Sequence, residues 1–150
     1  MSGEEKAMKL ALEGHNLLMV GTAGSGKTYL VNKLAGSLIK LGKHVQITCS
    51  TGIACSNYLK ATTVHKFCGL ADGRNNTKDI PEIVKSHSAL LNQIEQCDVL
   101  FIDECSMISE QTLAQIEKAC SVKDYNKYFG GMQVILVGDF YQLPPVPKNI

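Results

Sequence analysis

The chain has 150 residues, a nearly balanced net charge of +1 and a hydrophobic content of 45%. A chain of this length buries roughly two-thirds of its unfolded surface, which supports one domain with one core. The charge balance argues against a polyanion-binding tail, so any contact with nucleic acid has to come from a local groove.

No apolar run is long enough to span a membrane, and residues 1–5 are too acidic for a signal or transit peptide. The six cysteines contain no C-x-x-C pair. Several of them lie in apolar strand or helix patterns. Reduced core cysteines in a reducing, intracellular compartment are therefore favoured over a metal site.

In chain order, the first predicted elements are a helix near 4–13 and a buried strand at 16–20. A glycine-rich loop follows this strand and leads into a helix over 27–41. The loop has the complete phosphate-binding pattern, with glycines, a lysine and a hydroxyl residue at fixed offsets. It consists of Gly21, Thr22, Ala23, Gly24, Ser25, Gly26, Lys27 and Thr28.

Each part of this loop has a role in binding ATP with Mg²⁺. The glycines let backbone N–H groups approach phosphate oxygens, and the following helix points its partially positive N-terminus at them. Lys27 places a full charge near the β- and γ-phosphates, and the Thr28 hydroxyl is a ligand for Mg²⁺. The alternative, an ordinary Gly/Ser turn before a helix, is disfavoured by the spacing and the flanking elements.

The rest of the chain continues the alternation of strands and helices. Strands are expected at 44–49, 98–102 and 133–137, helices at 80–96 and at 109–120 after Ser109, and a polar loop at 72–77. This alternation predicts an α/β fold, with a parallel sheet, helices on both faces and ligands at the carboxyl ends of the strands.

Two carboxylates, Asp103 and Glu104, follow a buried apolar strand. Charge beside such a strand needs a cation or hydrogen-bond partners, so we expect Asp103 to bind Mg²⁺ together with Thr28. Glu104 would then orient and deprotonate the water that attacks the γ-phosphate. The structural alternative is that one of the two carboxylates caps the next helix.

The last strand also ends in a glycine and polar residues. Gln142 carries both a donor and an acceptor, so we expect it to contact the γ-phosphate or the attacking water and to report its loss. Without the other motifs, this segment would be interpreted as a strand followed by a proline turn.

Together these motifs resemble motifs I, II and III of superfamily 1 helicases. Asp-Glu-x-Ser-Met-Ile at 103–108 and Gly-Asp-Phe-Tyr-Gln-Leu-Pro-Pro-Val at 138–146 are similar to the PIF (petite integration frequency) family of 5′-to-3′ DNA helicases. Ser-Thr-Gly-Ile-Ala at 50–54 and Thr-Thr-Val-His-Lys-Phe-Cys-Gly at 62–69 resemble the family's motif Ia and its extension.

The resemblance covers residues 2–147 and implies the first RecA-like P-loop NTPase domain of an ATP-dependent helicase. It also implies single-stranded DNA as a partner, a second RecA-like domain, and work in DNA repair, recombination or telomere maintenance, in the nucleus or the mitochondrion. By this resemblance Thr51 and His65 contact the DNA strand, Lys66 lies near a phosphate, and Phe67 either stacks on a base or packs inward.

The residues alone also allow a core phenylalanine and a helix-end histidine at 65–67. A modest basic run, interpreted as a solvated face, is formed by Lys118, Lys123 and Lys127. The family's adenine-reading glutamine has no counterpart in residues 2–6, and the only arginine, Arg74, lies in the polar loop.

Because residues 1–150 end just after motif III, we expect a first motor domain that is incomplete on its own. One hypothesis is a DNA-stimulated ATPase motor that works with a second domain, which would supply the arginine finger. The other is a truncated nucleotide-binding or interaction module without turnover. An unrelated P-loop enzyme is a weaker third alternative.

Overall fold

The computed structural model describes residues 3–20, 26–70 and 76–138. Five parallel strands form one sheet in the order β1-β5-β4-β2-β3. The strands are β1 (Leu17–Val20), β2 (Val45–Cys49), β3 (Ala61–Thr63), β4 (Val99–Asp103) and β5 (Gln133–Gly138). The prediction of an α/β fold with a parallel sheet is therefore confirmed.

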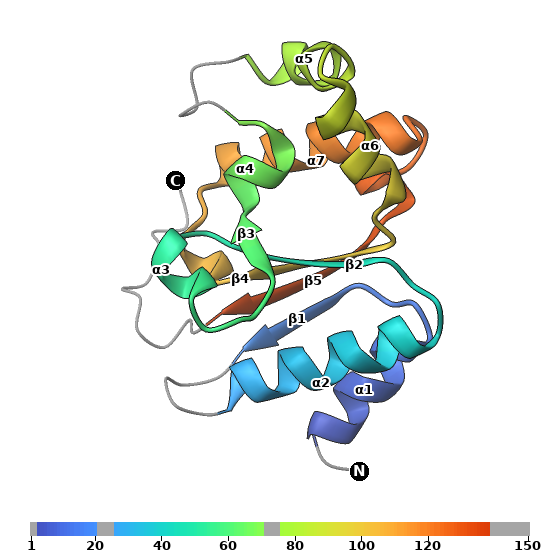
Figure 1. Cartoon of the computed structure of the whole chain (residues 1–150), viewed down its shortest axis with the longest axis vertical. Helices are drawn as coiled ribbons and strands as arrows, with labels where there is room; N and C mark the ends of the chain where they lie inside the picture. Colours follow the sequence, from blue (N-terminus) through green and yellow to red (C-terminus); the bar gives the residue numbers. More distant parts are fainter. Residues whose placement is uncertain (1–2, 21–25, 71–75, 139–150) are drawn as a thin grey trace, which may run out of the picture.

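Helices cover both faces of the sheet (Figure 1). One face carries α1 (Gly3–Leu12) and α2 (Lys27–Lys40). The other carries α4 (Val64–Cys68), α5 (Ile80–Lys85), α6 (Ser88–Gln96) and α7 (Glu110–Cys120), while α3 (Gly52–Cys55) lies at the carboxyl edge. Short 3₁₀ segments are η1 (Thr77–Asp79), η2 (Cys105–Met107), η3 (Ser121–Lys123) and η4 (Tyr128–Gly131).

The central strand β4 separates two hydrophobic cores, because its side chains alternate between the two faces of the sheet. Val99 and Phe101 pack with α1 and α2 in what we call the α2-side core. Leu100 and Ile102 pack with α4 to α7 in the α7-side core. All five residues of β4 are buried, as is typical of a parallel strand covered on both faces.

Sequence periodicity located four of the five strands to within one residue at each end. It missed β3, whose three residues are too short for any period and form a strand only by pairing with β2. It also missed the short helices α3 and α4, which begin after the capping hydroxyls of Thr51 and Thr63.

The prediction of one helix over 80–96 was wrong, because the chain turns at Ser86 and His87 between α5 and α6. The Ser86 hydroxyl donates to the carbonyl oxygen of Ile83 at 2.7 Å, and the His87 ring nitrogen lies 3.0 Å from the same oxygen. These side chains thus compete with the backbone for the bonds that would continue the helix. Ser109 does cap α7 as predicted, accepting from the Thr112 N–H.

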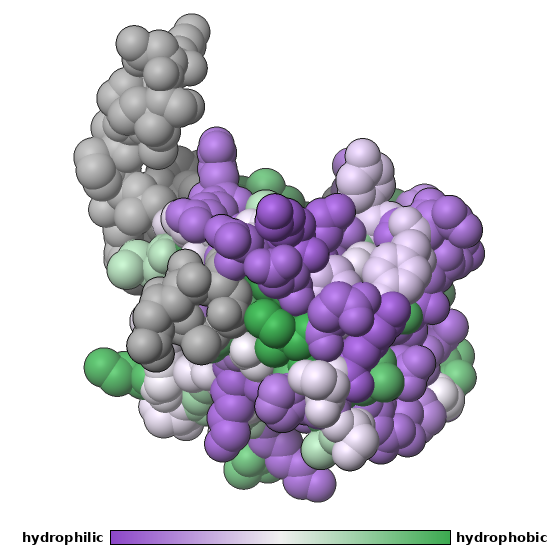
Figure 2. All heavy atoms as spheres, turned by 90° about the horizontal axis from the view of Figure 1, so that it is seen from above, coloured by the Kyte–Doolittle hydropathy of each residue, from purple (hydrophilic) through white to green (hydrophobic). Residues whose placement is uncertain are grey.

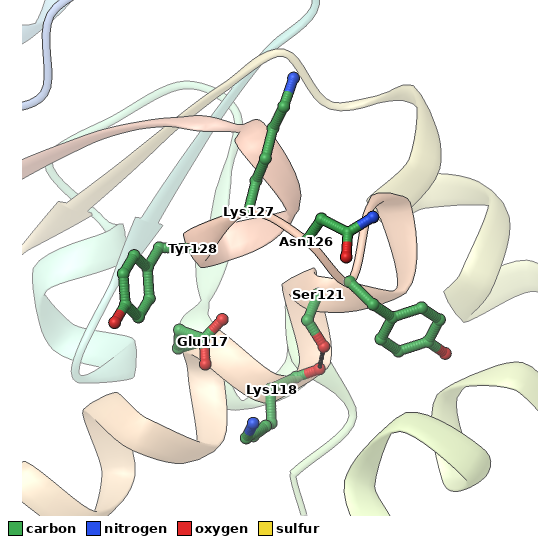
Figure 3. Close-up of a pocket in the computed structure, with 7 residues that line it drawn as sticks. Glu117, Lys118, Ser121, Asn126, Lys127 and Tyr128 are labelled. Atoms are coloured by element: carbon green, nitrogen blue, oxygen red, sulfur yellow. Dashed lines mark hydrogen bonds between the residues drawn. The ribbon is translucent and has the colours of Figure 1, made fainter.

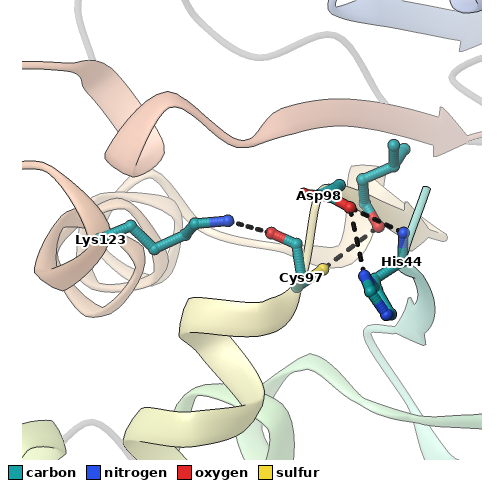
Figure 4. Close-up of polar contacts among 5 residues, drawn as sticks. His44, Cys97, Asp98 and Lys123 are labelled. Atoms are coloured by element: carbon teal, nitrogen blue, oxygen red, sulfur yellow. Dashed lines mark hydrogen bonds and ion pairs between the residues drawn. The ribbon is translucent and has the colours of Figure 1, made fainter. Parts of the chain in front are cut away.

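Polar contacts help to hold the amino edge of the sheet (Figure 4). The Asp98 carboxylate, just before β4, accepts the His44 N–H at 2.8 Å and lies 3.4 Å from the His44 ring. On the other side, the Lys123 ammonium donates to the carbonyl oxygen of Cys97. Lys123 therefore has a structural partner, which corrects its assignment to a purely solvated face.

Seen from the α5 end, the surface is mostly hydrophilic, with apolar side chains in small separate spots (Figure 2). Among the described residues, no helix has both the length and the hydropathy that a bilayer span requires.

Candidate nucleotide and metal site

The predicted motifs converge on one edge of the sheet. Strand register places Val20 beside Gly138 and Cys49 beside Asp103, so that β1, β5, β2 and β4 all end together. The phosphate loop follows β1, the carboxylates end β4, and motif III follows β5. Because the carboxyl ends of parallel strands are the usual ligand-binding edge, the topology brings the three motifs to one place.

The described part of the phosphate loop is the start of α2. Gly26 precedes the helix with φ 84° and ψ 19°, a left-handed conformation that favours glycine. Within the described residues no side chain caps this end, and a helix N-terminus is a favourable place for an anion. Lys27 and Thr28 are half-buried in the first turn. Gly21, Thr22, Ala23, Gly24 and Ser25 lie outside the described residues.

Asp103 is held at this edge with both carboxylate oxygens bonded. Its side chain is 7% exposed. Oδ1 accepts the Glu104 backbone N–H at 2.8 Å, and Oδ2 accepts the Tyr58 hydroxyl at 2.6 Å. The Tyr58 hydroxyl also interacts with the Thr28 side chain. The two predicted Mg²⁺ ligands, Thr28 and Asp103, thus meet at one tyrosine hydroxyl.

Asp103 contributes to a raised pKa in three nearby groups, one tyrosine and two cysteines. Burial first, and then the hydrogen bond and charge of Asp103, hold the pKa of Tyr58 well above its usual value. Burial raises the pKa of the Cys105 thiol to about 11, with Asp103 as the next cause, and the pKa of Cys49 is raised by burial with a smaller share from Asp103. All three groups are therefore neutral at physiological pH.

These residues fit a divalent cation. A carboxylate and a hydroxyl are hard oxygen donors of the kind that Mg²⁺ prefers. The Asp103 carboxylate is buried, and its two hydrogen-bond donors, the Tyr58 hydroxyl and the Glu104 N–H, carry no positive charge. The described residues contain no group of three or more His, Cys, Asp or Glu that could hold a metal, so this site offers one carboxylate and one hydroxyl as its protein ligands.

Glu104 adopts a backbone conformation that is unusual for a residue with a side chain. Its φ is 54° and its ψ is 42°, in the left-handed region, and its side chain is exposed. Strained residues of this kind persist where the surrounding structure fixes them, and they cluster at functional sites. The strain separates the directions of Asp103 and Glu104, so one carboxylate is buried in the sheet edge while the next reaches solvent. Neither carboxylate caps α7, whose cap is Ser109.

Ser50 adds a buried hydroxyl to the same edge. Its N–H donates to the Asp103 carbonyl oxygen at 3.1 Å. Its Oγ is buried without a hydrogen-bond partner among the described residues, the one side-chain atom there of which this is true. A buried polar atom without a partner is costly and marks a place where a ligand or water completes the bonding.

The residues predicted to contact DNA lie at the start of α3 and on α4, which follow β2 and β3. The Thr51 hydroxyl accepts the Ala54 N–H at 3.2 Å and so caps α3. His65 is half-buried and Lys66 is exposed in α4. Phe67, by contrast, is 2% exposed and belongs to the α7-side core. Of the two roles predicted for Phe67, inward packing is confirmed, and stacking on a base is wrong because the ring is buried.

Tyr58 and Ser50 were not identified from the sequence. Ser50 begins the motif Ia stretch but was given no role there, and Tyr58 lies outside the quoted motifs, so only the folded chain shows that they adjoin Asp103. Gln142 lies outside the described residues, so its predicted place near the γ-phosphate stays a prediction.

A separate open cavity of about 290 Å³ lies between α7 and η4 (Figure 3). Lys118 and Lys127 line it together with Glu117. Lys127 pairs with Asp124 at 3.9 Å, and the Glu117 carboxylate accepts the Phe129 N–H. Its charges are thus mixed and largely satisfied locally, so the solvated-face interpretation stands for these two lysines.

Comparison with known proteins gives consistent matches. The model of the PIF1-like helicase family matches residues 5–150. The chain is 36% identical over 148 residues to the ATP-dependent DNA helicase PIF5 of Trypanosoma brucei brucei, covering 97% of this chain and 16% of that protein. The chain therefore spans about a sixth of the length of that relative.

Solved structures agree with the sequence match. The crystal structure of the Candida albicans Pif1 helicase superposes with a TM-score of 0.85 at 36% identity, covering 99% of this chain and 34% of that one. A Bacteroides Pif1 helicase in complex with ADP-AlF3 and single-stranded DNA superposes with a TM-score of 0.79 at 31% identity, covering 99% and 34%.

Proposed function

Since the chain belongs to the PIF1-like helicase family, we propose that its carboxyl sheet edge binds Mg–ATP for a helicase motor that moves on single-stranded DNA. The observation that carries the proposal is that Thr28 and Asp103 both contact the Tyr58 hydroxyl, beside a start of α2 that no described side chain caps. Support also comes from the Bacteroides relative, which was crystallised with ADP-AlF3, a stand-in for a nucleotide with its γ-phosphoryl group in transfer.

In this proposal each residue has one role. The start of α2 and Lys27 bind the phosphates, while Thr28 and Asp103 provide oxygen ligands for Mg²⁺. When bound, Mg²⁺ would neutralise charge that develops on the phosphate oxygens. Glu104, which reaches solvent, accepts the proton of the attacking water. Gln142 contacts the γ-phosphate or this water.

The finer features are proposals that rest on the family. Thr51, His65 and Lys66 form the single-stranded DNA contact, and the motor moves 5′ to 3′ together with a second RecA-like domain. Its work is in DNA repair, recombination or telomere maintenance, within a reducing compartment such as the nucleus or the mitochondrial matrix. The six free cysteines support a reducing compartment, because a chain in an oxidising one commonly pairs them.

Nucleotide affinity of the Lys27→Ala variant tests the proposal. Loss of a hydrogen bond to a charged phosphate costs about 1.5–3 kcal/mol, so calorimetry should show Mg–ATP binding weakened by roughly tenfold or more. The control is Lys40→Ala, an exposed lysine in the last turn of the same helix, which should bind as the parent does. Equal affinity of Lys27→Ala and the parent would refute the phosphate-loop assignment.

A further inference from the structure

Tyr58 links a segment of the chain to a site that is distant from it in the sequence. In sequence it lies between α3 and β3, inside the segment 51–67 that we propose to contact single-stranded DNA. In space its hydroxyl donates to Oδ2 of the Asp103 carboxylate at 2.6 Å, and the Thr28 side chain is close enough to interact with it. No other side chain described here joins segment 51–67 to the Asp103 carboxylate by a hydrogen bond.

The ring of Tyr58 makes this link rigid. Its side chain is 7% exposed and packs in the α2-side core beside Ala54 of α3. A buried aromatic ring has few rotamers and cannot turn away without opening a cavity. When α3 or β3 shifts, the hydroxyl therefore moves with the backbone rather than swivelling to compensate.

Two apolar residues near Tyr58 in the sequence, one before it and one after it, face solvent. Ile53 in α3 is 87% exposed, and the next residue after Tyr58, Leu59, is fully exposed. The part of this segment from 51 to 63 thus exposes side chains to a partner, while the buried Tyr58 side chain bonds to the Asp103 carboxylate. Because β3 is an edge strand of three residues, paired only with β2, this segment is the part of the sheet that a partner displaces most readily.

We propose that Tyr58 is a positioning residue that couples single-stranded DNA binding at segment 51–67 to the metal ligand Asp103. The coupling rests on the proposed function, since it needs both ligands. Strand binding fixes segment 51–67, and this holds the Tyr58 hydroxyl, and with it the Asp103 carboxylate and the Thr28 hydroxyl, in the arrangement that takes the cation. Partners that orient a metal ligand in this way commonly change metal affinity by about 10–100-fold when removed.

Metal affinity measured with and without DNA tests this coupling. We would titrate the full chain, saturated with ADP, with Mn²⁺ and follow free Mn²⁺ by electron paramagnetic resonance, in the presence and absence of a short oligothymidylate. For the parent, DNA should tighten Mn²⁺ binding by about fivefold or more, a usual range for coupled sites. Tyr58→Phe keeps the ring and removes only the hydroxyl, and should bring this ratio to within about twofold of one.

The control is Tyr128→Phe, which removes the hydroxyl of an exposed tyrosine in η4 and should keep the parent ratio. A merely structural role of Tyr58 would lower thermal stability and leave the ratio unchanged, and that result overturns the proposal. A parent ratio of one, with both ligands bound, overturns it as well. A parent that binds neither ADP nor DNA refutes the proposed function instead, so the two failures are distinguishable.

The parent provides a second measurement should Tyr58→Phe not fold. With ring ¹³C-labelled tyrosine, the Tyr58 resonance should shift on addition of oligothymidylate alone and shift again when Mg²⁺ and ADP are added. A Tyr58 resonance that is indifferent to the DNA strand overturns the coupling.

Discussion

The backbone N–H of Glu104 donates to the carboxylate of the residue before it, Asp103, at 2.8 Å. This bond lies at the end of β4, where Glu104 has a left-handed φ of 54°. The turn there fixes the metal ligand and directs the next carboxylate outward. The proposed catalytic role of Glu104 therefore depends on a backbone conformation that is unfavourable for a glutamate.

Replacing Glu104 by glycine should raise the stability of the fold while lowering its activity. A left-handed backbone costs a residue with a side chain roughly 1–2 kcal/mol, and glycine offsets about 0.5–1 kcal/mol of this through its freer unfolded state. Glu104→Gly should therefore raise the free energy of unfolding by about 0.5–1 kcal/mol in urea, while single-turnover phosphate release slows. Glu95→Gly, in the exposed face of α6, should instead lose about 1 kcal/mol. If Glu104→Gly had a lower free energy of unfolding than the parent, the inference that the Glu104 backbone is strained would be contradicted.

Phe67 should matter for the core and not for DNA. Phe67→Leu shortens a fully packed side chain and should lower the free energy of unfolding by about 1–2 kcal/mol. Its affinity for a fluorescent oligonucleotide should stay within twofold of the parent, because stacking on a base would be worth about 1–3 kcal/mol. Leu59→Ala, an exposed position, is the stability control and should change little. A loss of DNA affinity at unchanged stability would restore the stacking role.

The edge formed by α3 and α4 should carry a salt-dependent DNA contact. The double variant His65→Ala/Lys66→Ala should bind an oligonucleotide more weakly and lower the slope of log K against log salt by about 0.7 for each phosphate that the variant no longer neutralises. The control Lys9→Ala/His15→Ala removes the same residue types from exposed positions in α1 and in the connection from α1 to β1. If the two double variants bind alike across a salt series, the DNA contact lies elsewhere.

The amino edge should show its own dependence on pH. The His44 backbone N–H, followed by smaller contributions of Lys123 and the His44 ring, holds the pKa of Asp98 below its usual range of about 3.9. A carboxyl pKa that is lower in the folded state stabilises above the unfolded value, and this stability is lost as pH falls through the folded value. The Asp98 and His44 side chains are 42% and 75% exposed, so screening limits the effect to about 1 kcal/mol or less.

Unfolding free energies of Asp98→Asn and the parent, measured from pH 7 down to below pH 3, check this. The variant should be less stable at neutral pH, and the difference should close in the acid range described above. Asp79→Asn, at an exposed position before α5, controls for the loss of one negative charge. A difference that persists unchanged at the lowest pH would show that the charge of Asp98 is not its cause.

The sequence predicted those parts of the fold and site that depend on local pattern. Strand β4 was found because a run of apolar residues leads up to a carboxylate, and α7 because Ser109 precedes an amphipathic run. β3 was not found, because its pairing with β2 is a tertiary contact. Tyr58 was not found because nothing in chain order separates it from any other tyrosine, and its 45-residue distance in sequence from Asp103 is closed only by folding.

The alternation of β4 between the two cores has a consequence for cooperativity. Its buried side chains contribute to both helical layers, so neither layer can open without losing part of the packing of the other. The amide hydrogens of β4 and β5 should thus exchange with solvent only through global unfolding, whereas those of β3 exchange through local fraying. On this expectation Asp103 ends a slowly exchanging strand, and Tyr58 precedes a strand that exchanges faster. The hydrogen bond from Tyr58 to Asp103 therefore joins a rigid central strand to a segment that can fluctuate.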